Sequence, residues 1–430
     1  MTATADILDF AAAAHILPTQ VRADAERLLA DTLAVGAAGS TAPGAEGVQA
    51  TARLWGQGSE ARILGTAEWM PATSAAYVNG FHIHCLEWDA VHEPAVVHAM
   101  SVVTAALHAA IDRRGGCDAD EALTALAVGV DVASGLGIAA DTPLRFFRPA
   151  TAGLMGAALA VARIEGLSRA QFADALGLAH SHVAGTMQAH VEGSIALPLQ
   201  IANAARAAVH VVDLVKHGLT GPHDALEGPF GYMALFDTGD LSRYTHDLGS
   251  VWRISEISTK PYPSGRASHA VLGALADVRE SGRTIMAMTA HVPPLIARLV
   301  GRPFKADMTP AYARLCLPLL VALMLHDGRI DPRRFTAETF TDPLILDIAG
   351  QVEIVVDANP YQNALSPQRL EIRYADCTAQ QIIIPNTLGS PDAPMNAAQS
   401  AQKRVLCEVL AATVDRRLFD TPLAYFTEPQ

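Results

Sequence analysis

Titratable side chains are concentrated in one segment of the sequence, residues 79–98. These twenty residues hold four of the sixteen histidines and three carboxylates, although charged residues make up only 17% of the chain. Gathering ionisable groups into partly buried surroundings costs free energy, so such a concentration is typical of proton transfer, anion binding or metal binding rather than of packing alone. We therefore expect this segment to form part of an active site.

The segment offers a base for proton abstraction from a carbon next to a carboxylate. That chemistry needs a base with a pKa near neutrality and fixed positive charge to stabilise the resulting anion. His98 is the first candidate, because the reference pKa of histidine is about 6.5. Asp89 is expected to orient His98 or to act as the base itself. The alternative for His98 is a structural role as the cap of the helix that follows.

A second group of candidates lies in the turn that begins at Lys260. Pro261 excludes a regular helix interior there. We expect Lys260 to be a second acid/base or a carboxylate anchor, and Tyr262, Arg266 and His269 to contribute to the same substrate-binding pocket. The alternatives are a surface cation for Lys260 and a packed turn aromatic for Tyr262.

Two arginines could recognise a carboxylate elsewhere in the chain. Arg145 and Arg148 flank two phenylalanines, and a guanidinium binds a carboxylate through two parallel hydrogen bonds, which lysine cannot do. One of the two is expected to bind substrate, and the other to be solvated.

A metal site is the alternative interpretation of residues 79–98. His82 and His84 form an H-x-H pair, and further oxygen and nitrogen ligands are available from Glu87, Asp89, His92 and Glu93. However, no HExxH or CxxC spacing fixes a metal geometry. We expect no metal, and we expect His84 to contribute to substrate binding. The chain also lacks GxGxxG, Walker and GxSxG motifs, so we expect no cofactor and no serine hydrolase.

Composition limits the partners and the location. The net charge of −13 argues against nucleic acid. Apolar runs such as 152–162 and 315–325 are shorter than the roughly 20 residues that cross a bilayer, so no membrane span is expected. The first ten residues are acidic where a secretory signal is basic, and the five cysteines are odd in number and scattered. We therefore predict a cytoplasmic protein.

The distribution of helical and strand patterns predicts a mainly α fold with two domains. Apolar residues recur at helical spacing over 4–39, with a break near Pro18, and again in several segments up to about residue 250. Asp118, with Glu121, and Ser168 are expected N-caps. Strand-like segments follow at 284–292, 351–356, 369–373 and 380–384. We predict a large all-helical domain (1–257 with 391–430, including a helical stretch at 394–419) and a smaller α+β domain (258–390).

Four segments resemble the MmgE/PrpD family, which includes 2-methylcitrate dehydratase, cis-aconitate decarboxylase and iminodisuccinate epimerase. They are Asn79-Gly80 with the run from His84 to His98, Gly218-Leu-Thr-Gly-Pro222 with Leu226-Glu-Gly228 and Gly231, Lys260-Pro-Tyr-Pro-Ser-Gly-Arg266 with His269, and 196–206. The resemblance implies a homodimer with its active site between the two domains, which would bring Lys260 to the first segment.

The sequence departs from the family pattern at three places. Asp89-Ala90-Val91 stands where dehydratase-like and decarboxylase-like members tend to have Asp-Asp-Thr. Arg148 stands where they carry a histidine, which favours Arg148 over Arg145 as the substrate ligand. Leu197 or a neighbour stands where they have a lysine ahead of a helix.

These departures favour one reaction among those of the family. We expect a cofactor-independent enzyme that removes a proton α to a carboxylate of a small di- or tricarboxylic acid, as an epimerase or isomerase similar to iminodisuccinate epimerase. The alternatives are a hydro-lyase, a decarboxylase, and a non-catalytic carboxylate-binding or structural dimer.

Overall fold

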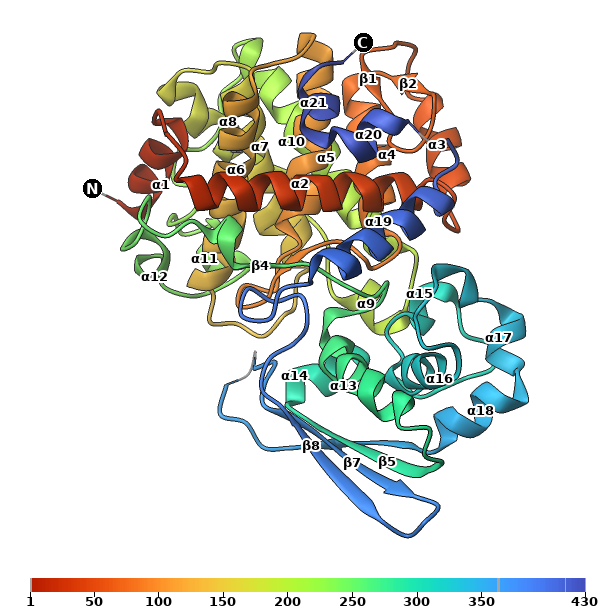
Figure 1. The fold of residues 1–430 in the computed structure, drawn as a ribbon. Coiled ribbons are helices and arrows are strands. Elements are labelled where there is room, and N and C mark those ends of the chain that lie inside the picture. The colour runs from red at the N-terminus through yellow and green to blue at the C-terminus, as the bar shows by residue number, and fades with distance from the viewer. Residues whose placement is uncertain (1, 362–363, 414, 430) are drawn as a thin grey trace.

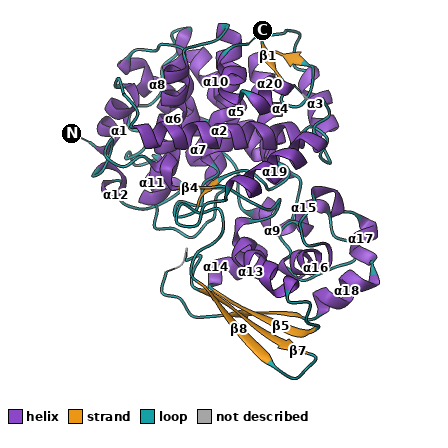
Figure 2. Cartoon of the chain, in the orientation of Figure 1, coloured by secondary structure: helices purple, strands orange, loops and turns teal. Residues whose placement is uncertain are grey.

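The computed structural model describes residues 2–361, 364–413 and 415–429, and over these ranges the protein is mainly helical with one small mixed sheet (Figure 1). Figure 2 shows a larger body built mostly of helices, and a smaller body that has helices next to the larger one and the sheet at its far end. The predicted mainly α fold is thus confirmed at this level.

The larger body contains the helices of the first 250 residues. They are α1 (Ala3–Ala12), α2 (Thr19–Gly39), α3 (Ala45–Arg53), α4 (Ala72–His84), α5 (Ala99–Arg114), α6 (Ala119–Ala139), α7 (Arg148–Ile164), α8 (Arg169–Ser181), α9 (Gln188–Glu192), α10 (Ala196–Lys216), α11 (Tyr232–Leu235) and α12 (Ser242–Thr245). The short strands β1 (Ala61–Arg62) and β2 (Trp69–Met70) pair antiparallel. The predicted caps are present: Asp118 accepts hydrogen bonds from two backbone N–H groups of α6, and Ser168 forms a capping box with Gln171.

The smaller body combines helices with the sheet. It comprises α13 (His269–Glu280), β5 (Ile285–Val292), α14 (Pro294–Val300), α15 (Pro310–Ala313), α16 (Leu317–Asp327), α17 (Ala337–Thr341), α18 (Pro343–Gly350), β6 (Val352–Val356), β7 (Gln368–Tyr374) and β8 (Ala379–Ile384). The strand order is β6-β5-β7-β8, with β5 and β6 parallel and the other pairs antiparallel. All four predicted strand segments are therefore strands.

Buried apolar side chains form two clusters. The first extends from Ile7 to Ile257 and includes side chains between Cys407 and Phe426, and the second extends from Ala267 to Ile384. The chain returns to the larger body through α19 (Ala397–Leu410), α20 (Arg416–Asp420) and α21 (Pro422–Thr427). Figure 1 shows α2 lying across one face of the larger body with α19 beside it.

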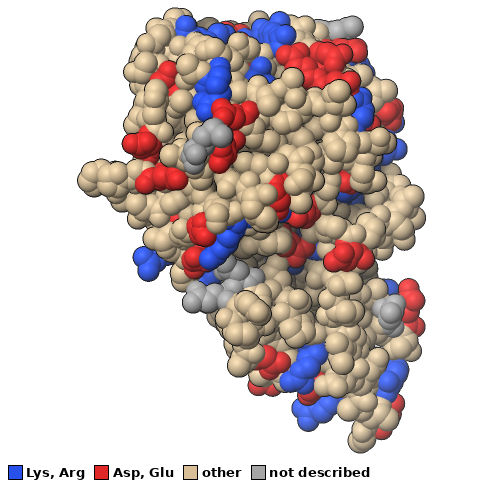
Figure 3. Space-filling model, turned by 90° about the vertical axis from the view of Figure 1, so that its left-hand side faces the viewer, with Lys and Arg blue, Asp and Glu red and all other residues tan. Residues whose placement is uncertain are grey.

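Helix α6 is long and apolar enough to cross a membrane, with a mean hydropathy of 1.7, although the sequence was expected to contain no run of that length. In the fold it is a core helix, because 94% of its most apolar window is buried inside the protein. On the face drawn in Figure 3, Lys and Arg side chains are interspersed with Asp and Glu side chains. That face is therefore neither uniformly positive nor uniformly negative.

The first part of the 79–98 segment is helical. Its residues up to His84 form the last turns of α4, and Asn79 and Gly80 serve to position this helix. The Asn79 side chain accepts a hydrogen bond from the backbone N–H of Leu64 at 2.9 Å and donates one to the carbonyl of Arg62 at 2.9 Å. A Cβ on Gly80 would lie 3.1 Å from Cα of Ala202 on α10, so glycine permits the close packing of the two helices.

Candidate active site

Two short strands join the 79–98 segment to the Lys260 turn. β3 (Val91–His92) pairs antiparallel with β4 (Ile257–Ser258), so that Val91 lies opposite Ser258. After β3 the chain folds back at once, and His92 and Val97 exchange two backbone hydrogen bonds of 2.9 and 3.2 Å. This tight loop returns His98 to Asp89, while the strand pair carries Lys260 alongside them. Residues 170 positions apart in the sequence are thereby brought together.

Asp89 is the centre of the resulting cluster and is completely buried. Its Oδ2 lies 2.9 Å from Nδ1 of His84 and 3.0 Å from Nδ1 of His98, and it also accepts a hydrogen bond from the hydroxyl of Ser101. Its Oδ1 has no hydrogen-bond partner among the described residues. The rings of His84 and His98 meet edge to face, with centroids 4.8 Å apart. One carboxylate oxygen therefore lies against both imidazoles, through a hydrogen bond to His84 and at ion-pair distance from His98.

The electrostatic environment gives the two histidines opposite tendencies. Burial lowers the pKa of His98, and although Asp89 opposes this, the positive charges of Lys260 and His84 act with burial, so the pKa ends below its usual value. Burial also acts to lower the pKa of His84, but the carboxylates of Asp89 and Glu87 outweigh it and the pKa is raised. The lowered pKa favours the neutral form of His98, which is able to accept a proton, whereas the raised pKa shifts His84 toward its charged form.

Lys260 is bonded to Glu87 rather than open to the solvent. Its Nζ donates to the carbonyl of Glu87 at 3.0 Å and to the Glu87 carboxylate at 3.2 Å, and it lies 3.9 Å from Oδ1 of Asp89. Burial acts to raise the pKa of Glu87, but Lys260, His84 and His98 together lower it to about 2. Lys260 thus keeps Glu87 ionised and is itself completely buried.

A pocket between the larger and the smaller body opens onto this cluster. The larger body contributes Glu87, Val91, Glu93, Val96, His98, Leu144, Phe147, Arg148, Pro149, Met187, His190 and Leu197, and the smaller body contributes Gly265, Arg266, Ala267, Leu299, Val300, Leu315 and Leu365. Most of these side chains are apolar, and a few ionisable groups converge among them, which is the usual character of a small-molecule site.

Arg148 and Arg266, two of the predicted substrate ligands, line this pocket, and both already have protein partners. Arg148 donates to Asp237 at 3.0 and 3.2 Å and to the carbonyls of Ala95 and Thr142 at 3.1 and 2.9 Å. Arg266 forms an ion pair of 2.8 Å with Glu93 and donates to two further carbonyls. Only a minority of their N–H groups remain for a ligand.

The other three predicted substrate ligands, Tyr262, His269 and His84, are not among the residues that line the pocket. Tyr262 lines a separate groove together with Trp88 and Lys403. His269 is completely buried, and its Nε2 lies 3.1 Å from the hydroxyl of Ser264. Burial, reinforced by the charge of Arg266, holds the pKa of His269 well below its usual range. The structure therefore brings together Asp89, His98, His84 and Lys260, but not Tyr262 or His269.

Two of the residues considered as metal ligands, His84 and Asp89, lie close to each other and to His98. One ligand atom from each of His84, Asp89 and His98 lies within 4.8 Å of the others. The remaining histidines have different partners, because His82 Nδ1 lies 3.2 Å from the carbonyl of Leu64 and His92 Nε2 lies 2.8 Å from Glu256. Glu93 binds Arg266. The expected absence of a metal stays a prediction.

Some pocket residues were not recognised from the sequence as substrate-site residues. Glu87 was considered only as a metal ligand, yet it lines the pocket, and so does Val96. Both residues have a backbone φ of 54°. Left-handed backbone at residues other than glycine is a feature of functional loops. His190 lines the pocket from α9, and burial with the charge of Arg302 lowers its pKa to about 4. No pattern in the sequence indicated His190.

Comparison with known proteins assigns the chain to a protein family. The family model of the MmgE/PrpD N-terminal domain matches residues 5–244, and that of the MmgE/PrpD C-terminal domain matches residues 262–417. The chain therefore belongs to the MmgE/PrpD family, as the four sequence segments indicated.

Among its relatives are several cis-aconitate decarboxylases. The human cis-aconitate decarboxylase is 27% identical over 76% of this chain and 71% of its own length. The enzyme of Mus musculus is 26% identical over 76% of this chain and 70% of its own length. The cis-aconitate decarboxylase of Aspergillus terreus is 25% identical over 61% of this chain and 57% of its own length.

Proposed function

We propose that this protein is a lyase that acts on a small di- or tricarboxylic acid at the pocket between the two bodies. The observation that carries the proposal is the environment of His98, whose Nδ1 lies 3.0 Å from the buried carboxylate of Asp89 while its side chain reaches the pocket. Membership of a family with carboxylic-acid enzymes, and similarity to cis-aconitate decarboxylases, support the same conclusion.

The geometry suits proton transfer at carbon. With Nδ1 directed at Asp89, the other ring nitrogen of His98 is the one available to a substrate in the pocket. Since its pKa is lowered, neutral His98 accepts a proton from the carbon next to a carboxylate. In a decarboxylation, His98 first takes up a proton from solvent and delivers it to the carbon after CO₂ has left. Asp89 stabilises the imidazolium that forms, and Ser101 and His84 hold the Asp89 carboxylate in place.

A lyase fits the arrangement better than the epimerase predicted from the sequence. An epimerase that works with two bases needs them on opposite faces of the substrate, and Lys260 was the predicted second base. In the fold, Lys260 is completely buried and bonded to Glu87, and it is not among the residues that line the pocket. Loss of CO₂ or water requires only one group to transfer a proton at the reacting carbon.

The epimerase remains the second candidate because of Arg148. This arginine stands where the family resemblance implies a histidine, and its guanidinium is occupied by Asp237 and two carbonyls. A lyase that used a histidine at this position as its acid would lack that group here.

Product analysis in D₂O separates the candidates. The purified protein is incubated with cis-aconitate and with hydroxylated tricarboxylic acids, and the products are followed by NMR and by CO₂ release. A lyase releases CO₂, or adds or removes water, with one solvent deuteron at carbon where protonation occurs. An epimerase incorporates deuterium at a stereocentre with neither change. No turnover, together with a rise in melting temperature on adding the acids, would instead support the non-catalytic binding protein.

A homodimer and a cytoplasmic location stay predictions. Light scattering coupled to size-exclusion chromatography tests the first, and cell fractionation tests the second.

A further inference from the structure

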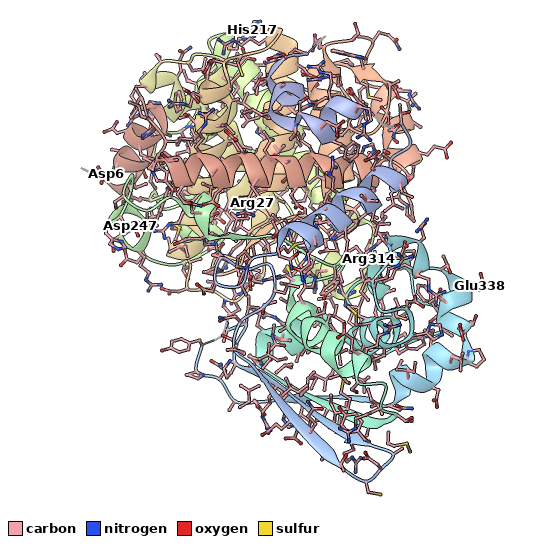
Figure 4. The ribbon with its side chains drawn as sticks, in the orientation of Figure 1. Asp6, Arg27, His217, Asp247, Arg314 and Glu338 are labelled. Atoms are coloured by element: carbon pink, nitrogen blue, oxygen red, sulfur yellow. The ribbon has the colours of Figure 1, made fainter. Side chains whose placement is uncertain are left out.

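Arg314 is a buried cation without an acidic partner among the residues that the structure describes. It is 2% exposed and lies just before α16, at the level where the two bodies meet (Figure 4). Its Nη1 donates to the carbonyl of Cys85 at 3.2 Å, and its guanidinium lies 5.1 Å from the ring centre of Phe335. Its Nε has no hydrogen-bond partner within the described part of the chain.

This distinguishes Arg314 from three other cations near the pocket. Arg148 is paired with Asp237, Arg266 with Glu93, and Lys260 with Glu87. Arg314 forms no ion pair with any described carboxylate, and burial lowers its pKa although the charge of Glu87 opposes this. A buried charge without a counter-ion is costly, so the site favours an anion that the protein itself does not supply.

Arg314 lies beside the candidate active site. It lines a small cavity together with His84, Glu87, Ser194 and Leu197. Glu87, Leu197 and Leu315 also line the pocket that contains His98, so the two spaces share walls. The pocket and the smaller cavity at Arg314 are therefore adjacent.

Two further features add positive potential at the same place. Helix α10, which has 21 residues, begins at Ala196 beside Ser194 and Leu197, and the N-terminal end of a helix carries positive partial charge. Arg302, 8% exposed, also has a buried nitrogen, Nη1, without a hydrogen-bond partner among the described residues. A Cβ on Gly193, which lines the cavity, would lie 2.8 Å from this nitrogen.

We propose that Arg314 binds a carboxylate of the substrate at the start of α10, as a subsite next to His98 that selects acids with an additional carboxylate. The family resemblance implies a lysine ahead of this helix, where this chain has Leu197 or a neighbour. Arg314 thus supplies the positive charge beside the helix. The inference rests on the proposed function for its substrate class, but binding alone is enough to test it.

The test compares two acids that differ by one carboxylate. Binding of propane-1,2,3-tricarboxylate and of glutarate to the full chain is measured by isothermal titration calorimetry. We expect the tricarboxylate to bind the native protein more tightly, and Arg314→Met to remove that preference, because losing one charge-assisted interaction reduces affinity by roughly 10- to 100-fold. Arg314→Lys keeps the charge without the planar donor pair and should retain part of the preference.

Arg329→Met is the matched control, because Arg329 belongs to the same body and its side chain is 69% exposed. It should leave both affinities unchanged. The proposal would be overturned if Arg314→Met weakened the binding of both acids equally, which is the sign of a purely structural residue. It would also be overturned if the variant weakened the binding of neither acid. Failure of the native protein to bind either acid would overturn it as well.

The outcome is separable from that of the proposed function. Loss of the preference in Arg314→Met, in a protein that turns over none of the acids tested, would keep the subsite and reject the lyase. Confirmed lyase activity with unchanged kcat/KM in Arg314→Met would keep the lyase and reject the subsite.

Discussion

The Asp89 cluster and the cluster at residues 264–269 contain similar groups in different states. Each holds a buried histidine, hydroxyl groups and a charged neighbour, and each was predicted to contribute to the site. In the first, Oδ1 of Asp89 has no hydrogen-bond partner among the described residues, and His98 lines the pocket. In the second, Nε2 of His269 is 3.1 Å from the hydroxyl of Ser264 and Nδ1 is 3.5 Å from Arg266.

The difference shows what converts a group of polar residues into a reactive site. Polar atoms that satisfy one another are inert, and they stabilise the turn that contains them. Polar atoms left incomplete beside a cavity are available to a ligand. We therefore expect substitutions in the Asp89 cluster to reduce turnover, and substitutions at Ser264, Ser268 and His269 to reduce stability.

The largest effect on turnover is expected for His98→Asn. Removal of a general base lowers rates by about 10²- to 10⁴-fold, and kcat/KM with the acid that is turned over should fall by this amount while the melting temperature changes little. The measurement is steady-state kinetics together with thermal unfolding.

His269→Asn is the matched comparison, because this histidine is also buried and hydrogen-bonded. It should lower the melting temperature. It should change kcat/KM less than about tenfold, since a buried residue that does not line the pocket affects the reaction only by shifting the residues that do. Equal loss of turnover in both variants would remove the distinction between the two clusters.

Lys260→Met should have the largest effect on stability. Breaking a buried ion pair by removing one partner costs about 3–5 kcal/mol, and this change leaves the nearly buried Glu87 carboxylate without its cation. The free energy of unfolding is measured by urea denaturation at neutral pH. Lys305→Met, at an exposed lysine, is the control and should stay within about 0.5 kcal/mol of the native protein. An equally small change in Lys260→Met would mean that Glu87 does not depend on Lys260.

A pH-dependent effect is expected for His84→Gln. The pKa of His84 is raised in the folded protein, so its contribution to stability is fully present below the unfolded pKa of about 6.5 and is lost as the pH rises through the folded pKa. The difference in melting temperature between the native protein and His84→Gln should therefore be larger near pH 6 than near pH 9. The opposite trend would indicate that His84 is neutral when folded.

The smallest effect is expected for Ser101→Ala. This hydroxyl donates to Asp89 and is not among the groups that line the pocket, so losing it should lower kcat/KM by roughly three- to tenfold, the equivalent of one ordinary hydrogen bond. Ser268→Ala removes an equally buried hydroxyl from the other cluster, where it lies 3.0 Å from the hydroxyl of Ser264. It should leave kcat/KM unchanged.

The sequence predicted local structure well where the signal was local. Pro18 separates α1 from α2, Ser168 caps α8 through Gln171, and alternating β-branched residues identified the strands of the sheet. Helices α14 to α18 were not resolved individually within the predicted α+β domain. Most of them have eight residues or fewer and begin at a proline, so they are too short for helical periodicity to be visible.

The site was predictable in its residue types but not in its contacts. The density of histidines and carboxylates identified Asp89 and His98, and the family resemblance brought in Lys260. The partner of Arg148, the bond from Lys260 to Glu87 and the isolation of Arg314 all depend on pairs that are distant in sequence. Such pairs form only when the β3–β4 contact and the junction of the two bodies are in place, and no local pattern encodes them.

A crystal structure with propane-1,2,3-tricarboxylate bound tests the central claim most directly. The ligand should occupy the pocket between the two bodies, with a carbon next to a carboxylate facing the free ring nitrogen of His98 and another carboxylate at Arg314. A ligand found instead in the groove of Tyr262 and Lys403, with the His98 pocket unchanged, would contradict the assignment of the Asp89–His98 pocket as the active site.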